Sequence, residues 1–340
     1  MRSAESTELL DKPNERTSDA VAAHGDVAVG AGVVSKSAAG ARSVGAGSVD
    51  AGGTGSVDSV GDSSVDDFDF AAFDTKESIF SYICRSLAEL KNIKFALASF
   101  VVNNLRRRYR RSVLGFAWSL LNPLLTMAVM TAVFSLLWHS NPKSFGVYVF
   151  TGLLPWTYIT DSIMMGSQSL VQSEAFLKKV YIPKSFFPLV AVSTETANFA
   201  FSLASLMLMA MIVGVHMNWT VLLVPAAIAL LFLFNFSVTL ILAVATVYFR
   251  DLTHIIKVGL STVFYLVPII YNLEMVPEKY RVLFLLNPVY YFIDLFRALI
   301  YVGQVPDATR WAIPGLITLI TLTIAFYTLK KTDKDLIYRL

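Results

Sequence analysis

Long apolar runs separated by short polar turns dominate the chain from residue 114 onward. Each run is close to or longer than the roughly 20 residues that a helix needs to cross a hydrocarbon core of ~30 Å. We therefore predict an all-α membrane protein with six transmembrane helices. The predicted spans are Leu114–Trp138, Phe145–Val171, Phe186–Val215, Trp219–Tyr248, His254–Tyr271 and Trp311–Leu329.

Residues 76–112 show another pattern, because apolar side chains recur every three or four positions among basic ones. This spacing is typical of an amphipathic helix. We predict a cytoplasmic interface or gate helix, which serves either as a simple surface anchor or as a helix packed beside a pathway or partner. The helix leads into a basic cluster made of Arg106, Arg107, Arg108, Tyr109, Arg110 and Arg111.

A broken apolar segment occupies residues 277–302. Asn287 and Pro288 interrupt it, and each half of about 10 to 14 residues spans only ~15–21 Å as a helix, which is too short to cross. We predict a re-entrant helical hairpin that enters from the outer face, with a pair of interfacial helices as the alternative. Asp294 and Arg297, three residues apart, are expected to pair with each other.

The composition supports membrane insertion and gives it a direction. Hydrophobic residues make up 55% of the chain and charged residues only 16%, whereas soluble domains have ~25% charged residues. With both termini in the cytoplasm, 18 Lys and Arg of residues 76–340 lie inside and five lie outside. This imbalance predicts cytoplasmic termini, because basic residues are retained on the cytoplasmic side.

The sequence predicts a tail at each end of the chain. Residues 1–75 contain 13 acidic and five basic side chains among many Ala, Gly, Ser and Val residues. Such a segment cannot bury enough apolar surface to offset its conformational entropy, so we predict a disordered acidic low-complexity tail. Residues 331–340 are predicted to form a short cytoplasmic C-terminal tail.

The loop at residues 173–184 is the most informative connection. Its apolar residues fall on one stripe beside lysines, so we predict a short amphipathic helix capped by Ser173 and ended by Pro183. The helix suits insertion into a partner's groove, although an ordinary basic loop that only sets topology is the alternative. Arg250 and Asp251 at the end of the fourth span are expected to pair locally or to bond free helix ends in a tight intracellular turn. The candidate partner-contact residues are Ser173, Glu174, Phe176, Leu177, Lys178, Lys179, Tyr181, Pro183, Lys184, Arg250 and Asp251.

Catalytic signatures are missing from the sequence. It contains no GxxxxGK[ST] phosphate loop, no HExxH and no GxSxG, and its one cysteine is Cys84. Asp161 and Glu195 lie inside predicted spans, where acids are costly and are either functional or bonded to neighbouring helices. We expect movement of a substrate, with no metal or cofactor in this chain, and a membrane enzyme that uses one of these acids is the weaker alternative.

Several ordered blocks carry a family likeness. The segments Tyr109–Leu125, Gly152–Thr160 and Tyr248–Ile300 resemble the permease subunit of type 2 ABC exporters. Within that group they resemble the branch that exports O-antigen, teichoic acid or galactan. A small-molecule exporter of the same fold is the nearer alternative.

The resemblance implies a set of partners. Two copies of the chain would form a homodimer around a conduit, and two separate ATPase subunits would bind ATP and Mg. The cargo would be a polyprenyl-diphosphate-linked polysaccharide, moved outward across a bacterial plasma (inner) membrane. Membrane lipids are expected partners and nucleic acid is not.

The resemblance also implies roles for residues. Residues 173–184 would be the coupling helix seated in the ATPase, with Phe176, Leu177 and Tyr181 as anchors. The arginine cluster at 106–111 would meet a lipid phosphate or pyrophosphate. The pathway candidates are Asp161, Glu195, Tyr158, Tyr265, Tyr290, Tyr291 and Phe292.

Overall fold

The structure, a computed structural model, describes residues 78–108, 114–138, 142–214 and 218–339. The predicted acidic tail, together with Tyr109, Arg110 and Arg111 of the basic cluster, lies outside the described residues. The described part is built from helices and contains no strand. The predicted all-α class is therefore confirmed for these residues.

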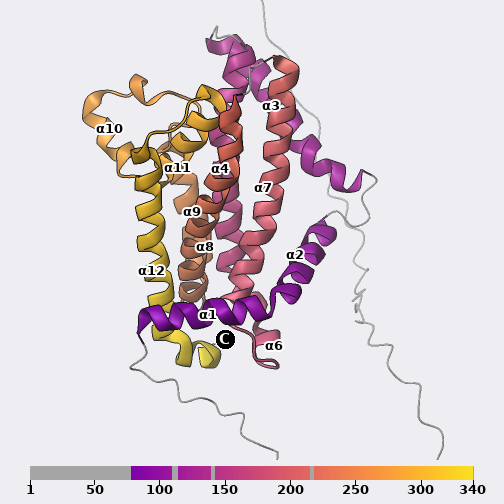
Figure 1. The fold of residues 1–340 in the computed structure, drawn as a ribbon, viewed down its shortest axis with the longest axis vertical. Coiled ribbons are helices and arrows are strands. Elements are labelled where there is room, and N and C mark those ends of the chain that lie inside the picture. Colours follow the sequence, from indigo (N-terminus) through magenta and orange to yellow (C-terminus); the bar gives the residue numbers. More distant parts are fainter. Residues whose placement is uncertain (1–77, 109–113, 139–141, 215–217, 340) are drawn as a thin grey trace, which may run out of the picture. The chain divides into compact units, whose positions relative to one another are not determined.

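Six helices of the described chain run beside one another in a bundle, and the other helices lie at its two ends or along its side (Figure 1). The bundle helices are α3 (Trp118–Trp138), α4 (Pro142–Ser167), α7 (Phe186–Val213), α8 (Val224–Tyr248), α9 (Leu252–Tyr265) and α12 (Ala308–Arg339). The others are α1 (Ile79–Asn92), α2 (Lys94–Arg108), α5 (Ser169–Gln172), α6 (Glu174–Leu177), α10 (Glu278–Leu285) and α11 (Pro288–Arg297), which continues as a π-helical turn over Ala298–Val302. Three 3₁₀ segments cover Gly115–Ala117, Trp219–Leu223 and Leu273–Met275.

Two apolar cores hold the bundle together. The larger core lies among α4, α7, α8 and α11 and contains fully buried rings such as Phe292 and Phe296. The second core joins α7, α8 and α12 through residues such as Phe186 and Phe326. Burial of side chains of this size stabilises a packed interface by roughly 1.5–3 kcal/mol each in water, and dispersion contacts provide the corresponding gain within lipid.

Three segments are long and apolar enough to cross a membrane: Phe186–Ile212, Trp219–Tyr248 and Ala308–Asp333. Two further apolar helical segments, Leu121–Val133 and Leu252–Tyr265, are shorter. These segments confirm the predicted membrane protein, while the count of six spans stays a prediction.

The predicted fifth span is wrong in its extent. It was expected to run to Tyr271, but α9 ends at Tyr265 and is only ~21 Å long at ~1.5 Å per residue. Pro268 explains the early end, because a proline disfavours the helical conformation of the residue before it. The chain from Val267 to Tyr271 continues without helical structure.

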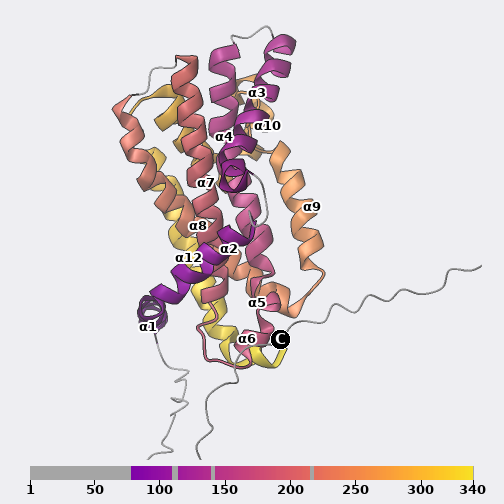
Figure 2. The same cartoon turned by 90° about the vertical axis from the view of Figure 1, so that its right-hand side faces the viewer.

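The predicted helix over residues 76–112 is not one helix. It is broken at Ile93, and α1 lies across the end of the bundle while α2 turns along its side (Figures 1 and 2). Tyr82 and Leu90 of α1 are buried in the second core, where α1 packs on α12, whereas α2 packs on α7. A straight helix cannot follow both surfaces, which accounts for the break.

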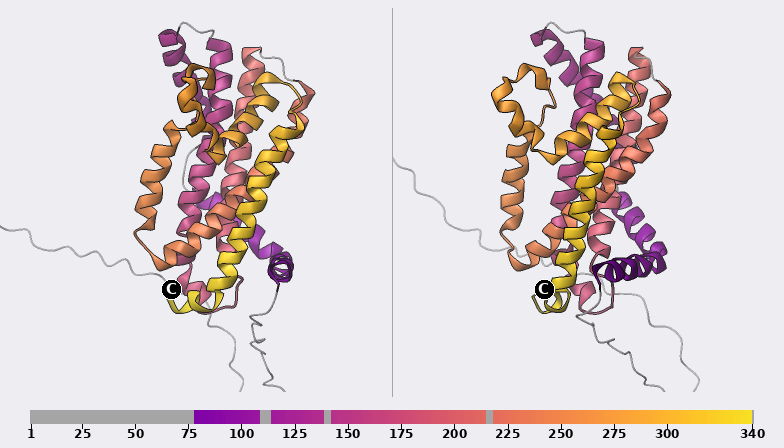
Figure 3. Two further views of the ribbon diagram at one scale, coloured as in Figure 1. Left: turned by 90° about the vertical axis from the view of Figure 1, so that its left-hand side faces the viewer. Right: turned by 60° about the vertical axis from the view of Figure 1, so that its left-hand side comes forward.

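The predicted C-terminal tail is helical, because α12 continues through it to Arg339, and its cytoplasmic position stays a prediction. Leu336 is fully buried in the second core and holds this last part of α12 in place. The end of α12 therefore lies beside α6 and α1, at the same end of the bundle (Figures 1 and 3).

The break at Asn287 and Pro288 is confirmed. The helices on its two sides, Glu278–Leu285 and Pro288–Val302, are bent by 94°. The side chain of Asn287 accepts a hydrogen bond of 3.0 Å from the backbone amide of Val289 and caps α11, and Pro288 occupies the first turn, where its missing amide costs nothing. Whether the pair enters the membrane from the outer face stays a prediction.

Candidate functional site

The predicted coupling helix is only one turn long. Of residues 173–184, α6 covers Glu174–Leu177, and the side chain of Ser173 makes no capping hydrogen bond. The chain from Val180 to Ile182 leaves the helical conformation because β-branched residues and the following Pro183 favour extended backbone. The predicted helix is thus replaced by one helical turn followed by an extended segment, in which Val180 and Tyr181 are exposed.

The three predicted anchors divide between the surface and the core. Phe176 is 53% exposed and Tyr181 is 76% exposed, whereas Leu177 is only 7% exposed and belongs to the second core. The ring of Phe176 rests edge-on against Phe100 of α2, with ring centroids 6.2 Å apart. Leu177 therefore cannot reach a partner, and of the three predicted anchors Phe176 and Tyr181 are available for docking.

A local charge network surrounds α6. Lys178 donates a hydrogen bond of 2.6 Å to Glu174 one turn away. This bond and, more weakly, the charge of Arg250 hold the pKa of the Glu174 carboxyl below its ordinary value. The two predicted cytoplasmic loops are therefore close enough to interact. The predicted pairing of Arg250 with Asp251 is wrong: within the described chain they form no ion pair, and the Asp251 side chain does not cap α9.

Lys184 is engaged inside the chain. Its ammonium group bonds both the carboxylate and the backbone carbonyl of Asp333, which lies in the last part of α12. Both side chains are largely buried. Nothing in the spacing of these residues, which are 149 positions apart, indicated this pair. Lys184 thus fixes the coupling segment to α12 and is not available as a partner contact.

A cavity of about 800 Å³ lies beside this pair. Residues of α1, the segment after α6 and the end of α12 line it, and they include Tyr82, Lys179, Tyr181 and Tyr338. Burial raises the pKa of the Tyr82 hydroxyl well above its ordinary value, so this group is neutral at physiological pH. The cavity places the exposed lysine and tyrosine of the coupling segment at the edge of a concave surface.

The basic cluster and one of the intramembrane acids meet. Nη1 of Arg108 lies 3.3 and 3.4 Å from the two carboxylate oxygens of Glu195 in α7. Asn198, one turn further along α7, donates a bond of 3.0 Å to the same carboxylate. Glu195 is 3% exposed, so its charge is compensated from two sides, while Arg106 and Arg107 in the same turn of α2 remain exposed. The i,i+3 spacing of Glu195 and Asn198 was a usable sequence signal for the second contact.

Asp161 differs from Glu195. It is exposed on α4, on the same helix face as Thr157 and Met165. Within the part of the chain that the structure describes, its side chain forms no ion pair or hydrogen bond. Of the two acids, Asp161 therefore keeps its carboxylate free for another group.

Two of the predicted pathway aromatics belong to the core. Tyr158 is 3% exposed, bonds Thr196 through its hydroxyl at 2.7 Å and stacks on Phe199. Phe292 is fully buried against Phe234. Neither can line a pathway, because their surfaces are already covered by this chain. Among the remaining candidates, Tyr265 is highly exposed, and Tyr290 and Tyr291 are half-buried.

The predicted pair of Asp294 and Arg297 does not form. Arg297 is buried, donates a hydrogen bond of 2.6 Å to the carbonyl of Ile269 and lies 4.1 Å above the ring of Tyr148. Asp294 points elsewhere and pairs with Arg310 of α12 at 3.4 Å. The three-residue spacing puts the two side chains on neighbouring faces of α11, and tertiary contacts take them in different directions.

Clusters that could bind a metal ion are not found in the described residues. No group of three or more His, Cys, Asp and Glu side chains in the searched ranges is arranged to hold a metal ion. The structure instead has exposed side chains at one end of the bundle, such as Phe176 and Tyr181, next to the ion pair of Lys184 and Asp333.

Comparison with known proteins shows which family the chain belongs to. The profile of the ABC-2 type transporter family matches residues 96–301, which is more than half of the chain. The chain belongs to the ABC-2 type transporter family. The match begins within α2 and ends in the π-helical turn after α11, so it includes the coupling segment, the Arg108–Glu195 contact and the broken α10–α11 pair.

The relatives of this ABC-2 protein carry the names of export permeases and of a transport protein. It is 34% identical over 226 residues to the O-antigen export system permease protein RfbA of Myxococcus xanthus, which covers 66% of this chain and 87% of the relative. It is 29% identical over 212 residues to a protein of the same name from Klebsiella pneumoniae, covering 62% and 82%. The polysialic acid transport protein KpsM of Escherichia coli is 21% identical over 244 residues, covering 68% and 91%.

Family membership confirms part of the prediction. An ABC-2 protein is a multi-pass membrane subunit of a transporter and not an enzyme, and it works with an ABC ATPase. The surfaces described above can therefore be considered as places where such a subunit meets its ATPase and its cargo.

Proposed function

We propose that this chain is the membrane-spanning subunit of an ATP-driven exporter that moves a polyprenyl-diphosphate-linked polysaccharide out of a bacterial cytoplasm across the plasma membrane. The observation that carries the proposal is the 34% identity to a permease named for O-antigen export, which extends over 87% of that relative. A glycan of the O-antigen, teichoic acid or galactan type fits this likeness. The similarity to a polysialic acid transport protein supports the same class of cargo.

The proposed topology has six spans and both termini in the cytoplasm. The spans are α3, α4, α7, the Trp219–Tyr248 helix, α9 with the chain after it, and α12. In support, α1, α6 and the end of α12 lie at one end of the bundle (Figure 1), and α1, the segment after α6 and the end of α12 carry nine basic residues, namely Arg85, Lys91, Lys178, Lys179, Lys184, Lys330, Lys331, Lys334 and Arg339. The α10–α11 pair then lies toward the outer end and forms a re-entrant closure.

The proposed energy source is a pair of separate ATPase subunits that bind ATP and Mg. Their motion enters the membrane subunit through Phe176 and Tyr181, the two exposed aromatic side chains of the coupling segment. The link from Lys184 to Asp333 carries this motion to α12. Two copies of the chain would enclose the conduit. Asp161, whose carboxylate forms no ion pair or hydrogen bond within the described residues, would lie beside this conduit.

The proposed contact with the lipid diphosphate uses the exposed end of α2. Arg106 and Arg107 are free to meet a phosphate, whereas Arg108 is bound to Glu195 and positions that end of the helix. Arginine suits this task because its planar donors match phosphate oxygens in pairs.

Reconstitution tests the proposal. The chain is purified with the ATPase that accompanies it from native membrane, placed in liposomes, and assayed for ATP-driven movement of a lipid-linked polysaccharide. We expect transport to need the ATPase, and Phe176→Ser with Tyr181→Ser to reduce both ATPase association and transport at least tenfold. Leu222→Ser is the matched control, because Leu222 is 79% exposed in the 3₁₀ segment before α8.

Three results would contradict the proposal. Transport by the chain without an ATPase would remove the ATP-driven mechanism. Unchanged ATPase association in the double variant would remove the docking surface. Transport of small molecules but not of lipid-linked glycan would change the class of cargo.

A further inference from the structure

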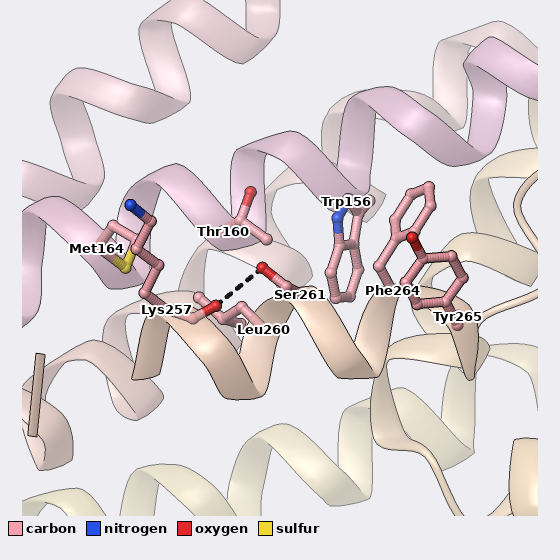
Figure 4. A pocket seen from close by; sticks show the side chains of 8 residues that line it. All are labelled: Trp156, Thr160, Met164, Lys257, Leu260, Ser261, Phe264 and Tyr265. Carbon is pink, nitrogen blue, oxygen red and sulfur yellow. Dashed lines mark hydrogen bonds between the residues drawn. The ribbon is translucent and has the colours of Figure 1, made fainter. Parts of the chain in front are cut away.

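The cavity of about 800 Å³ beside Lys184 and Asp333 lies at the end of the bundle where α1, α6 and the end of α12 are found (Figure 1). It shares no lining residue with the groove between α4 and α9, which contains Tyr265, one of the predicted pathway residues (Figure 4). A volume of this size is typical of sites for small ligands. The cavity therefore has room for a few side chains of a peptide segment but not for a folded domain.

The lining of the cavity carries an excess of two positive charges. Four basic and two acidic side chains line it, namely Arg85, Lys178, Lys179, Lys184, Glu89 and Asp333. Both acids are already paired within the lining, since Glu89 contacts Arg85 at 3.8 Å and Asp333 bonds Lys184. Lys178 pairs with Glu174, whereas Lys179 is exposed and forms no ion pair among the described residues. Lys179 is therefore available to an acidic occupant.

Most of the remaining lining is apolar. Tyr82 and Leu177 are buried in it, whereas Val180 and Tyr181 are 56% and 76% exposed. Exposed apolar side chains gain free energy when another apolar group covers them, and an ammonium group bonds a carboxylate more strongly than a neutral acceptor. The cavity therefore favours an occupant that carries both aromatic and acidic side chains.

A segment of this chain has that composition and lies close to the cavity in the sequence. Residues 68–74, which lie outside the described residues, read FDFAAFD, with three phenylalanines and two aspartates. The described chain begins at Ser78, whose carbonyl accepts a hydrogen bond of 3.0 Å from the backbone amide of Tyr82 in the cavity lining. The four residues from Asp74 to Ser78 span up to ~14 Å when extended. This connection is long enough to bring the segment back to the cavity.

We propose that residues 68–74 occupy this cavity in their own chain, with the phenylalanines on the apolar lining and the aspartates toward Lys179. The two negative charges of the segment match the two excess positive charges of the lining. The short connection to α1 gives the segment an effective concentration on the order of millimolar at the cavity, so weak contacts are sufficient. Both the segment and α1 precede residue 96, where the family match begins, so the contact lies outside the part shared with the family.

Disulfide cross-linking in the full-length chain tests this proposal. The one cysteine, Cys84, is exposed on α1, so Cys84→Ser provides a cysteine-free background. Ala72→Cys in the segment is combined either with Val180→Cys in the cavity lining or with Ala175→Cys, the matched control. Ala175 is exposed on the adjacent α6 but does not line the cavity. The chain is studied without the ATPase, because Tyr181 is also a proposed ATPase contact. We expect the pair with Val180→Cys to form a disulfide within one chain about fivefold faster than the control pair.

Further substitutions in the same background test the contacts that hold the segment. Lys179→Glu is expected to slow cross-linking about fivefold, the largest factor that one exposed ion pair supplies. Asp69→Lys combined with Lys179→Glu is expected to recover part of the rate, because it restores opposite charges. Lys91→Glu is the control, since Lys91 is exposed on α1 and does not line the cavity. Phe70→Ser is expected to slow cross-linking without a change in charge.

Three outcomes would overturn the proposal. Equal rates for the two cysteine pairs would show that the segment does not prefer the cavity. A disulfide that joins two chains, in place of one within a chain, would show that the segment binds a second copy. Equal rates for Lys179→Glu and Lys91→Glu would show that the cation of the cavity does not hold the segment. All three are measured without the ATPase and without cargo, so they do not depend on the proposed function.

Discussion

Nη1 of Arg108 lies 3.3 and 3.4 Å from the two carboxylate oxygens of Glu195, and this contact joins the last turn of α2 to α7. Glu195 is nearly fully buried, whereas the Arg108 side chain is 51% exposed. The pair is therefore asymmetric. Its removal has different consequences depending on which partner is lost, because a buried charge without a partner costs far more than an exposed one.

Arg108→Gln is predicted to destabilise the protein more than Glu195→Gln. The first change leaves a buried carboxylate with only Asn198, and we expect a cost of ~1–3 kcal/mol, reduced from the fully buried case because the arginine is half exposed. The second change leaves an arginine that water can solvate and keeps a polar group beside Asn198. Thermal unfolding in the same detergent measures both shifts.

The matched control for this pair is Arg107→Gln, since Arg107 is exposed in the same turn of α2. It should leave the unfolding temperature within a degree or two of the wild type. A larger shift for Glu195→Gln than for Arg108→Gln would mean that the acid, and not its arginine, is the group that the surroundings stabilise.

The link between Lys184 and Asp333 predicts a second stability difference. Both side chains are largely buried, so Lys184→Gln and Asp333→Asn should each cost ~1–3 kcal/mol, and the two costs should not add. Lys178→Gln breaks the exposed pair with Glu174 and should cost no more than ~0.5 kcal/mol. Denaturant or thermal unfolding of the single and double variants forms the test, and additive losses would show that the two residues act independently.

The sequence was sufficient for the elements that depend on local chemistry. Apolar runs located the long helices, and the Asn287–Pro288 step located the break, because an asparagine cap and a proline in the first turn specify a helix start without help from the rest of the fold. Ordered sequence blocks also carried the family likeness. These features are properties of neighbouring residues.

The sequence was insufficient where partners are distant. Arg297 has an acid three residues away, yet its guanidinium packs against Gly152 and the ring of Tyr148 on α4 instead. Leu177 and Phe176 are adjacent and both apolar, yet Leu177 is buried in the core and Phe176 is exposed. Because α6 is only one turn long, its sequence has no repeating pattern that could show which of the two faces the core. The Tyr158 and Phe292 rings failed as pathway candidates for a similar reason, since aromatic composition alone does not separate a core from a lining.

The different environments of Arg297 and Asp294 predict different mutational costs. Arg297→Met leaves the carbonyl of Ile269 without its donor and removes the stack on Tyr148, so we expect a loss of ~2–4 kcal/mol. Arg297→Lys should recover only part of this loss, because a lysine cannot stack and donate in the same geometry. Asp294→Asn breaks a partly exposed pair with Arg310 and should cost ~0–1 kcal/mol. Equal losses for Arg297→Met and Asp294→Asn in thermal unfolding would indicate that the two residues are paired after all.

The tight packing of α4 on α8 at Gly166 predicts the sharpest steric effect. A Cβ atom added at Gly166 would lie 2.0 Å from Cγ2 of Thr239, whose side chain is fully buried, so Gly166→Ala should cost ~1–3 kcal/mol through overpacking. Gly259→Ala is the matched control, because nothing lies within 4 Å of the added atom on α9 and alanine favours a helix by ~0.5–1 kcal/mol over glycine. Unfolding temperatures should therefore move in opposite directions. A Thr239→Ser substitution removes the clashing methyl group and should restore much of the stability lost in Gly166→Ala. If the double variant is no more stable than Gly166→Ala, the clash with Thr239 is not the source of the loss.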